Sequence, residues 1–280
     1  MTRLALVQHL FDESAERYGR DIAPVLAPLA ADFAAYAAPQ PEDRALDAGT
    51  GTGIVARLIA PRVRSVIGVD VSARSLDVAR RETAPANLHF ARADLNRLPF
   101  GAGAFALVVA SFGLNATDPD HSLPALRRAV APGGRLVLQE WGPIAEADRA
   151  LEDLLMDHIA DDPGPRVARL RAWLDEHPAP WREQLQDIDD YRERLAELGL
   201  AVEDATEDAP VTIRLAATEQ YLRFKLAWTY RFEEIRAMDP LARSAFYAGA
   251  RALLADAAKP DGSFLWRPVV FRVTARLAHP

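Results

Sequence analysis

The residues best suited to chemistry are three closely spaced glycines, Gly49, Gly51 and Gly53, in the segment LDAGTGTG at 46–53. Glycine permits turns with positive φ and lets a ligand approach the main chain without interference from a Cβ atom. A β-rich run precedes these glycines and a helical pattern follows them, so the helix would present free N–H groups to an anionic group. The segment therefore predicts a ligand-binding turn between a strand and a helix.

The spacing of the glycines separates two kinds of nucleotide-binding loop. A dinucleotide fingerprint has the pattern G-x-G-x-x-G, but the sixth position counted from Gly49 is Ile54, and the pattern is G-x-G-x-G. Asp70 and Asp94 close the next two β-rich runs. A carboxylate at the first position can accept hydrogen bonds from both ribose hydroxyls, and one at the second could accept from an adenine amino group. Three consecutive strand ends would then contact an adenosine.

Short β-rich runs alternate with helical segments from 44 to 141. The runs are RALDAG, SVIGVDVS, NLHFARAD, FALVVASF and GRLVLQEW, and the segments between them include GIVARLIAP, ARSLDVARRET and SLPALRRAV. Continuous apolar strands are expected where helices cover both faces of a parallel sheet. We therefore expect an α/β fold of the Rossmann-like, doubly wound type, with five parallel strands in this part of the chain.

The flanking segments are mainly helical. Residues 3–38 predict two helices with a break at Gly19. Beyond Trp141, the pattern predicts a helical cap with breaks at 161–165 and 177–181, a helix that ends at Gly199, a strand that ends in 209–215, two helices between 217 and 258, and a closing strand at 264–277.

Composition limits the partners of this chain. Its 280 residues include 33 Lys and Arg against 40 Asp and Glu, a formal net charge of −7 that disfavours nucleic acid. The absence of Cys excludes disulfides, thiolate catalysis and Cys-ligated zinc, and no compact ligand spacing indicates another metal site. The sequence has neither an apolar run of the roughly 18 to 20 residues that span a bilayer nor the pattern of a signal peptide. We expect no membrane partner and a cytoplasmic location.

Five segments, in this order, resemble the class I S-adenosylmethionine-dependent methyltransferases: LDAGTGTG, GVDVS, ADLNRLPF, FALVVASFGLNATDPD and LRRAVAPGGRLVLQEW. The segment FGLNATDPDHSL is also similar to the loop after the fourth strand in the quinone C-methyltransferases, a small-molecule branch of that family. The resemblance implies a seven-stranded, mostly parallel sheet with helical cap insertions, S-adenosyl-L-methionine as cofactor and a small organic acceptor. Beyond residue 142 the long cap departs from the quinone enzymes, so their substrate is not carried over.

The resemblance also implies divisions of the chain and site residues. The divisions are 1–43 (N-terminal helices), 44–141 (cofactor-binding core), 142–186 (helical cap insertion) and 187–280 (C-terminal part of the core with inserted helices and closing strand). Around the methionine moiety it places Gly49, Gly51 and Gly53, with Asp47 as support of the turn and Ser111 near the sulfonium. Asp70 would bind the ribose, Val71, Asp94 and Leu95 the adenine, and Tyr18 would close over the cofactor.

No catalytic residue is identified from the sequence. Glu140 closes the fifth strand, at the sheet edge where ligands bind, and His121 and His158 have the side chain most often used as a general base. A structural role is nevertheless the commoner one for each of these residues. Because a sulfonium is already activated, alignment and water exclusion can suffice. Aromatic residues in the capping parts form either ordinary core or the wall of an apolar pocket: Trp141, Trp173, Trp181, Phe224, Trp228, Tyr230 and Trp266.

The sequence thus predicts in-line methyl transfer to a carbon, oxygen or nitrogen nucleophile of a small organic acceptor. One alternative is a protein that binds the same cofactor without methyl transfer, such as a cyclase, because fold does not fix function. The other is a nicotinamide oxidoreductase, which Ile54 and the lack of an obvious Tyr-x-x-x-Lys pair in the expected region disfavour.

Overall fold

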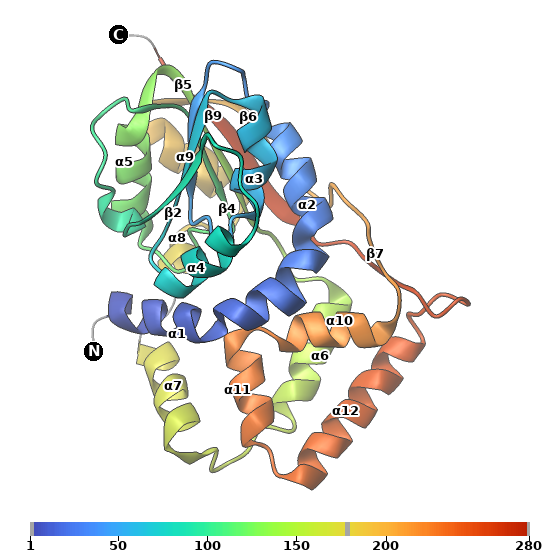
Figure 1. Cartoon of the computed structure of the whole chain (residues 1–280). Coiled ribbons are helices and arrows are strands. Elements are labelled where there is room, and N and C mark those ends of the chain that lie inside the picture. Colours follow the sequence, from blue (N-terminus) through green and yellow to red (C-terminus); the bar gives the residue numbers. More distant parts are fainter. Residues whose placement is uncertain (1–2, 177–179, 279–280) are drawn as a thin grey trace.

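A sheet of seven strands forms the centre of the molecule (Figure 1). The computed structural model describes residues 3–176 and 180–278. The strand order is β3-β2-β1-β4-β5-β9-β6, with β1 to β5 parallel and β9 antiparallel to both of its neighbours. The predicted doubly wound, mostly parallel sheet is confirmed. Its strands are β1 (Arg44–Ala48), β2 (Ser65–Asp70), β3 (Leu88–Arg92), β4 (Phe105–Ser111), β5 (Val130–Trp141), β6 (Leu200–Asp208) and β9 (Val270–Leu277).

Both faces of the sheet are buried at its central strands, which explains the apolar runs of β1 and β4. Successive side chains of a strand point to opposite faces, so Ala45 and Leu46 of β1 belong to two different hydrophobic clusters. One cluster includes residues of α2 (Ala23–Tyr36) and α3 (Ile54–Ile59), and the other includes residues of α5 (Pro119–Ala129) and α9 (Ile188–Glu197). The helix α4 (Ala73–Arg81) connects β2 to β3.

The N-terminal helices are bent rather than broken at Gly19. A π-helical turn, η1 (Tyr18–Ile22), joins α1 (Arg3–Arg17) directly to α2, so the predicted break is wrong in kind although correct in position. A Cβ atom at Gly19 would meet Val78 Cγ1 at 3.2 Å, so glycine permits close packing there. The bend lets α2 pack along the sheet while α1 crosses its end (Figure 1).

The segment after β5 forms a group of helices at the same end of the sheet as α1 (Figure 1). These helices are α6 (Glu146–Met156), α7 (Gly164–Glu176), α10 (Thr218–Leu226), α11 (Thr229–Ala237) and α12 (Pro240–Ala255). The short helix α8 (Pro180–Gln184) instead lies against the sheet, and its Trp181 and the following Leu185 belong to the same hydrophobic cluster as residues of α5 and α9. A third hydrophobic cluster joins this group to the N-terminal helices, because it contains Phe224 and Phe246 together with Ile22 and Leu26. The cap and the N-terminal segment therefore share one core.

Three details of the predicted C-terminal part are wrong. Three helices, not two, lie between 217 and 258, because the backbone is extended at Trp228 and Asp239. The strand predicted to end in 209–215 is two strands, β6 and β7 (Ile213–Leu215), separated by Pro210. The closing strand is likewise divided at Pro268 into β9 and β8 (Phe264–Trp266), which pairs with β7 in a separate sheet. Proline has no N–H for a ladder hydrogen bond, so it interrupts strands.

Other predictions about the cap have different outcomes. Gly199 follows α9 with φ +74°, as a helix-ending glycine should. The predicted break at 177–181 includes 177–179, which lie outside the described residues. The divisions at 43, 141 and 186 stay a prediction. In the described ranges no helix combines the length and the apolar character needed to cross a membrane, and the cytoplasmic location stays a prediction.

Candidate functional site

The glycine turn lies between β1 and α3, and each glycine has positive φ: +77° at Gly49, +53° at Gly51 and +82° at Gly53. Their surroundings differ. A Cβ atom at Gly49 would lie 2.5 Å from Gly113 Cα, and one at Gly53 would lie 2.7 Å from the Phe90 ring. A Cβ atom at Gly51 would meet no atom within 4 Å. The main chain at Gly51 therefore borders open space, while the other two glycines allow close packing.

Asp47 stabilises the glycine turn through hydrogen bonds to its carboxylate. Its carboxylate accepts hydrogen bonds from Thr50 Oγ1 at 2.7 Å and from the backbone N–H of Ala56 at 3.0 Å. The side chain is buried, and burial raises its pKa to about 6 although the two hydrogen bonds act in the opposite direction. This geometry agrees with the supporting role predicted for Asp47.

Asp70 connects the glycine turn to the end of β2. One carboxylate oxygen accepts from the N–H of Gly51 at 2.9 Å, and the other accepts from the N–H of Ser72 at 2.8 Å. Burial raises the pKa of this carboxyl group, and the two backbone hydrogen bonds oppose that rise. A carboxylate oxygen has more than one acceptor site, so each oxygen can still accept a hydrogen bond from a ligand.

A cavity of about 1080 Å³, partly open to solvent, lies over the carboxyl ends of β1, β2 and β4. On the core side it is lined by Asp47, Gly49, Thr50, Gly51, Thr52, Ile54, Val55, Asp70, Ser75, Ser111, Phe112, Gly113 and Asn115. On the other side it is lined by Phe11, Ser14, Ala15, Tyr18, Ile22, Leu26, Ala30, Ala227, Trp228 and Thr229.

A smaller recess adjoins this cavity, because Phe11, Gly49, Asp70 and Gly113 line both. Its lining includes Val71, Asp94 and Leu95, the residues predicted to contact adenine. Asp94 accepts from the N–H of Asn96 at 2.9 Å and so caps the short helix η3 (Leu95–Arg97). Nine of the ten predicted cofactor residues line one of the two spaces, and Gly53 lines neither. Their contact with a cofactor stays a prediction.

Aromatic rings form one wall of the cavity. Phe112 has φ +56°, and its ring stacks on Trp141 with a centroid distance of 3.9 Å and an interplanar angle of 15°. The Trp228 ring meets Tyr18 edge-on at 6.0 Å and Trp141 at 6.4 Å. Burial, together with the charge of Asp70, raises the pKa of Tyr18 to about 12. The Tyr18 hydroxyl therefore stays protonated at neutral pH.

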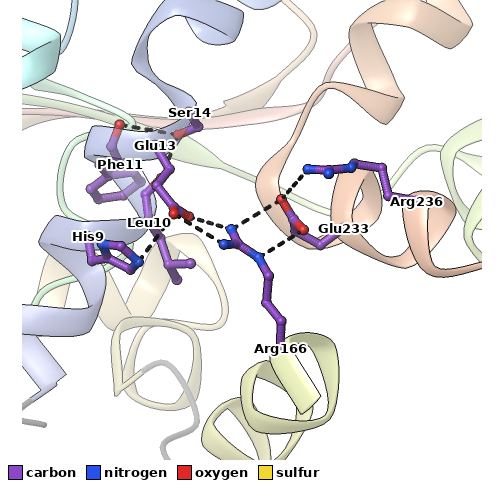
Figure 2. A network of polar contacts seen from close by, with 8 residues as sticks. All are labelled: His9, Leu10, Phe11, Glu13, Ser14, Arg166, Glu233 and Arg236. Carbon is purple, nitrogen blue, oxygen red and sulfur yellow. Dashed lines mark hydrogen bonds and ion pairs between the residues drawn. The ribbon is translucent and has the colours of Figure 1, made fainter. Parts of the chain in front are cut away.

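The helix α1 covers the cavity and is tied to the cap by ion pairs, which Figure 2 shows. Arg166 of α7 contacts Glu13 of α1 at 2.5 Å and Glu233 of α11 at 3.1 Å. Glu13 is also paired with His9 at 3.3 Å, and Glu233 lies 3.9 Å from Arg236. These contacts join three helices around the cavity, although Arg166 is half exposed and such pairs are individually weak.

The three candidate bases do not line the cavity. His121 pairs with Asp118 on the exposed start of α5. His158 lies beside the carbonyl of Leu154 at 2.9 Å. Glu140 is buried and accepts from the N–H of Leu114 at 3.0 Å, so it fixes the loop after β4. Within 3–176 and 180–278, no group of three or more His, Cys, Asp or Glu is placed to hold a metal ion.

Sequence reasoning missed Gly113 and Phe112 as parts of the site. A Cβ atom at Gly113 would lie 2.6 Å from the carbonyl oxygen of Ala48, so this glycine lets the loop after β4 press against the glycine turn. The pair FG after an apolar strand was the available signal. The hydrogen bond from Gln139 to Ser111 and the one from Arg272 to Gln139 were also missed, because Arg272 meets Gln139 only where β9 pairs with β5.

Comparison with known proteins agrees with this geometry. The family described as "Methyltransferase domain" matches residues 45–134. A demethylmenaquinone methyltransferase of Thermus thermophilus is 40% identical over 119 residues, which cover 41% of this chain and 53% of that protein. One of Deinococcus radiodurans is 35% identical over 177 residues, 59% of this chain and 70% of that protein. The chain thus spans about half the length of the first relative and more than two thirds of the second.

The fold recurs in solved structures of low sequence identity. The [4+2]-cyclase SpnF has a TM-score of 0.53 at 19% identity, over 91% of this chain and 81% of that one. Such a likeness shows the fold alone. The match to the Deinococcus radiodurans enzyme, together with the glycine turn and the strand order, shows the family. This chain belongs to the class I S-adenosylmethionine-dependent methyltransferases.

Proposed function

We propose that this protein binds S-adenosyl-L-methionine in the cavity and transfers its methyl group to a small organic acceptor. The observation that carries the proposal is a cavity and an adjoining recess with two unlike walls. One wall has the glycine turn, Asp70 and the recess beside Asp94, and the other has the aromatic rings of Tyr18, Phe112 and Trp228. The first wall suits an adenosine and an amino acid, and the second suits an apolar acceptor.

The residues present fit this cofactor. The main chain at Gly51 borders space that a Cβ atom would enter, and the Asp70 oxygens face the same cavity. The described lining residues of the cavity include two carboxylates, Asp47 and Asp70, and no Lys, Arg or His. Opposite charges attract more strongly where burial lowers the effective dielectric constant. The cavity therefore favours a cationic ligand.

When bound, the cofactor supplies a methyl group on a positively charged sulfur, ready for displacement. The chain's own contribution is alignment and the exclusion of water. Phe11 and Tyr18 cover the cavity from the N-terminal helices, and Trp228 covers it from the cap. The Tyr18 hydroxyl holds its proton, and both carboxylates accept hydrogen bonds from the turn. No lining residue is assigned as a base, so the acceptor must offer a nucleophilic lone pair or an electron-rich carbon by itself.

The demethylmenaquinone methyltransferases suggest, as part of this proposal, that the acceptor is a neutral ring compound, but the cap lies outside the segment that matches their family. Cyclase activity has no comparable support, since the likeness to SpnF concerns the fold alone.

The test is a calorimetric titration of the full chain with S-adenosylhomocysteine, with NAD as a parallel ligand. We expect binding of S-adenosylhomocysteine and none of NAD. Transfer of a labelled methyl group to ring compounds is then measured with the same preparation. Binding of NAD, or failure to bind S-adenosylhomocysteine, would contradict the proposal at its first step.

A further inference from the structure

Arg17, the last residue of α1, joins the N-terminal helices to the turn between α10 and α11. Its Nε donates to the carbonyl oxygen of Ala227 at 2.6 Å, and its guanidinium carbon lies 3.8 Å from the centroid of the Phe232 ring. Burial lowers the pKa of Arg17 and the charge of Glu233 opposes this fall, but a guanidinium group stays charged in proteins. The N-terminal helices and the cap therefore meet at a hydrogen bond with a charged donor.

The turn that Arg17 contacts is only two residues long. The helix α10 ends at Leu226, and α11 begins at Thr229. Ala227 and Trp228 are therefore the whole connection. Carbonyl groups at the end of a helix lack a partner within that helix, and a cation near this end is favourable. The Arg17 guanidinium thus caps the carboxyl end of α10 and fixes the position from which Trp228 extends.

Each end of this hydrogen bond is followed directly by an aromatic residue of the cavity wall. Tyr18 follows Arg17, Trp228 follows the residue that accepts the bond, and both aromatic side chains line the cavity. Their rings meet edge-on with a centroid distance of 6.0 Å and an interplanar angle of 83°. The backbone of Trp228 is extended, with φ −65° and ψ 139°, and its side chain is only partly buried. The hydrogen bond therefore sets how the two rings meet at the cavity wall.

A second contact lies on the same face of α1. Glu13 is one turn before Arg17, and residues four apart share a helix face. Glu13 contacts Arg166 of α7, which also contacts Glu233 of α11 (Figure 2). The Arg166 side chain is 53% exposed, and ion pairs of this kind are individually weak. Arg17 is partly buried and touches the turn itself, so we expect it to have the larger effect on Trp228.

The aromatic wall indicates which acceptor this alignment serves. The Trp228 ring also meets Trp141 edge-on at 6.4 Å, and Trp141 in turn stacks on Phe112. Phe112, like Trp228, lines the cavity. Aromatic rings attract one another more strongly than their buried area alone predicts, and the gain depends on the distance and angle between the rings. A flat aromatic acceptor therefore gains from a fixed Trp228, whereas a saturated ring of the same size does not.

We propose that Trp228 selects a flat aromatic ring as the acceptor, and that Arg17 is the positioning residue that holds Trp228 in place. The inference rests on the proposed function, because it takes the same cavity with the cofactor at its other wall. It gives a role to two residues that lie outside the segment 45–134 that matches the methyltransferase family. A positioning residue can remove at most what the positioned ring contributes, so the effect of Arg17 must depend on Trp228.

The test uses calorimetry on the full chain with excess S-adenosylhomocysteine and two probes, 2-naphthol and its saturated counterpart 2-decalol. The unaltered protein should bind 2-naphthol about threefold to tenfold more tightly than 2-decalol, and Trp228→Leu should abolish this preference. Arg17→Met should weaken 2-naphthol binding by about twofold or more, but should add nothing in the Trp228→Leu background. Affinity for S-adenosylhomocysteine should stay unchanged in every variant. Arg20→Met is the matched control, because Arg20 is 70% exposed and pairs with its neighbour Asp21.

Each outcome has a distinct meaning. If the unaltered protein does not bind S-adenosylhomocysteine, the proposed function fails and the inference fails with it. If it binds this ligand but shows no preference for 2-naphthol, or if Trp228→Leu keeps the preference, the proposed function stands and selection by Trp228 is refuted. If Arg17→Met has no effect, or if its loss multiplies with that of Trp228→Leu, Arg17 does not act through Trp228. An equal loss in Arg20→Met, or an equal loss of S-adenosylhomocysteine affinity, would show a structural role instead and also overturn the inference.

Discussion

Gly51 provides a sharp test of the site, because its backbone and its surroundings make separate demands. At φ +53° an alanine costs about 1 to 2 kcal/mol relative to glycine. Its Cβ atom would enter open space that we assign to the cofactor. Gly51→Ala should therefore fold, with the free energy of unfolding lowered by that amount. A methyl group placed in a closely packed contact costs about 1 to 3 kcal/mol, so S-adenosylhomocysteine should bind about 5 to 150 times more weakly.

Substitutions at two other glycines separate the cost to stability from the effect on ligand binding. Gly199→Ala has the same backbone cost, since φ is +74° and its Cβ atom also meets no atom within 4 Å, but it lies at the end of α9, away from the cavity. It should lose similar stability and bind the ligand normally. Gly49→Ala should be far less stable than either, because its Cβ atom would lie 2.5 Å from Gly113 Cα. Urea denaturation and calorimetry measure both quantities. Normal ligand binding by a folded Gly51→Ala protein would refute the assignment of this space.

Three further predictions concern buried charges. Asp70→Ala should weaken S-adenosylhomocysteine binding by about 1.5 to 3 kcal/mol in calorimetry, because charge-assisted hydrogen bonds are lost. The pKa of about 6 for Asp47 exceeds the ordinary 3.8, so the folded state binds its proton more tightly and the stability it contributes falls as pH rises between these values. When the pH is lowered from 7.5 to 5, the free energy of unfolding of the unaltered protein, measured by urea denaturation, should rise by about 1.4 kcal/mol relative to that of Asp47→Asn. Asp148→Leu should lower the free energy of unfolding by about 3 to 5 kcal/mol, and Lys225→Met by less, in the same assay.

The order of the last two effects follows from the partners left behind. Asp148 contacts Lys225 at 2.8 Å and also accepts hydrogen bonds from Tyr221 and Trp266. Without Asp148 the buried ammonium group loses its ion pair and keeps nearby aromatic faces, such as Trp266 at 4.1 Å, whereas without Lys225 the carboxylate keeps two donors. The opposite order would contradict this reasoning. For Asp70, unchanged affinity would remove it from the site, and for Asp47, parallel pH profiles of the two proteins would show that its pKa is not raised.

The central sheet could be predicted from the sequence because its central parallel strands, β1 and β4, are separate apolar runs. The runs that contain Leu46 and Val108 read as strands buried on both faces, and they are. The cap could not be divided correctly, because its boundaries depend on tertiary contacts. The segment 264–277 has strand-forming residues throughout, yet Pro268 allows its first part to pair with β7 and its second part to pair with β5.

The parts of the site that lie at strand ends, or in the turns directly after them, could be predicted from the sequence. Gly51, Asp70 and Ser111 are each the end of a strand or the turn after it, so their convergence follows from a parallel sheet. The relation between Gln139 and Arg272 could not be predicted, since the two residues are 133 positions apart and meet only through the register of β9 on β5. Glu140 shows that a position on a strand does not decide where a side chain points. It lies near the end of β5, as the sequence indicates, but successive side chains of a strand point to opposite faces, and Glu140 is not among the residues that line the cavity.

The two walls of the cavity come from different parts of the sequence, and this division limits what relatives can indicate. The glycine turn, Asp70 and Ser111 lie inside the segment 45–134 that matches the methyltransferase family. Tyr18 precedes that segment and Trp228 follows it. The wall that the relatives share indicates which cofactor binds, whereas the acceptor is selected by the side chains that touch it. The relatives therefore inform the cofactor, while the acceptor must be sought through the aromatic wall that the N-terminal helices and the cap build together.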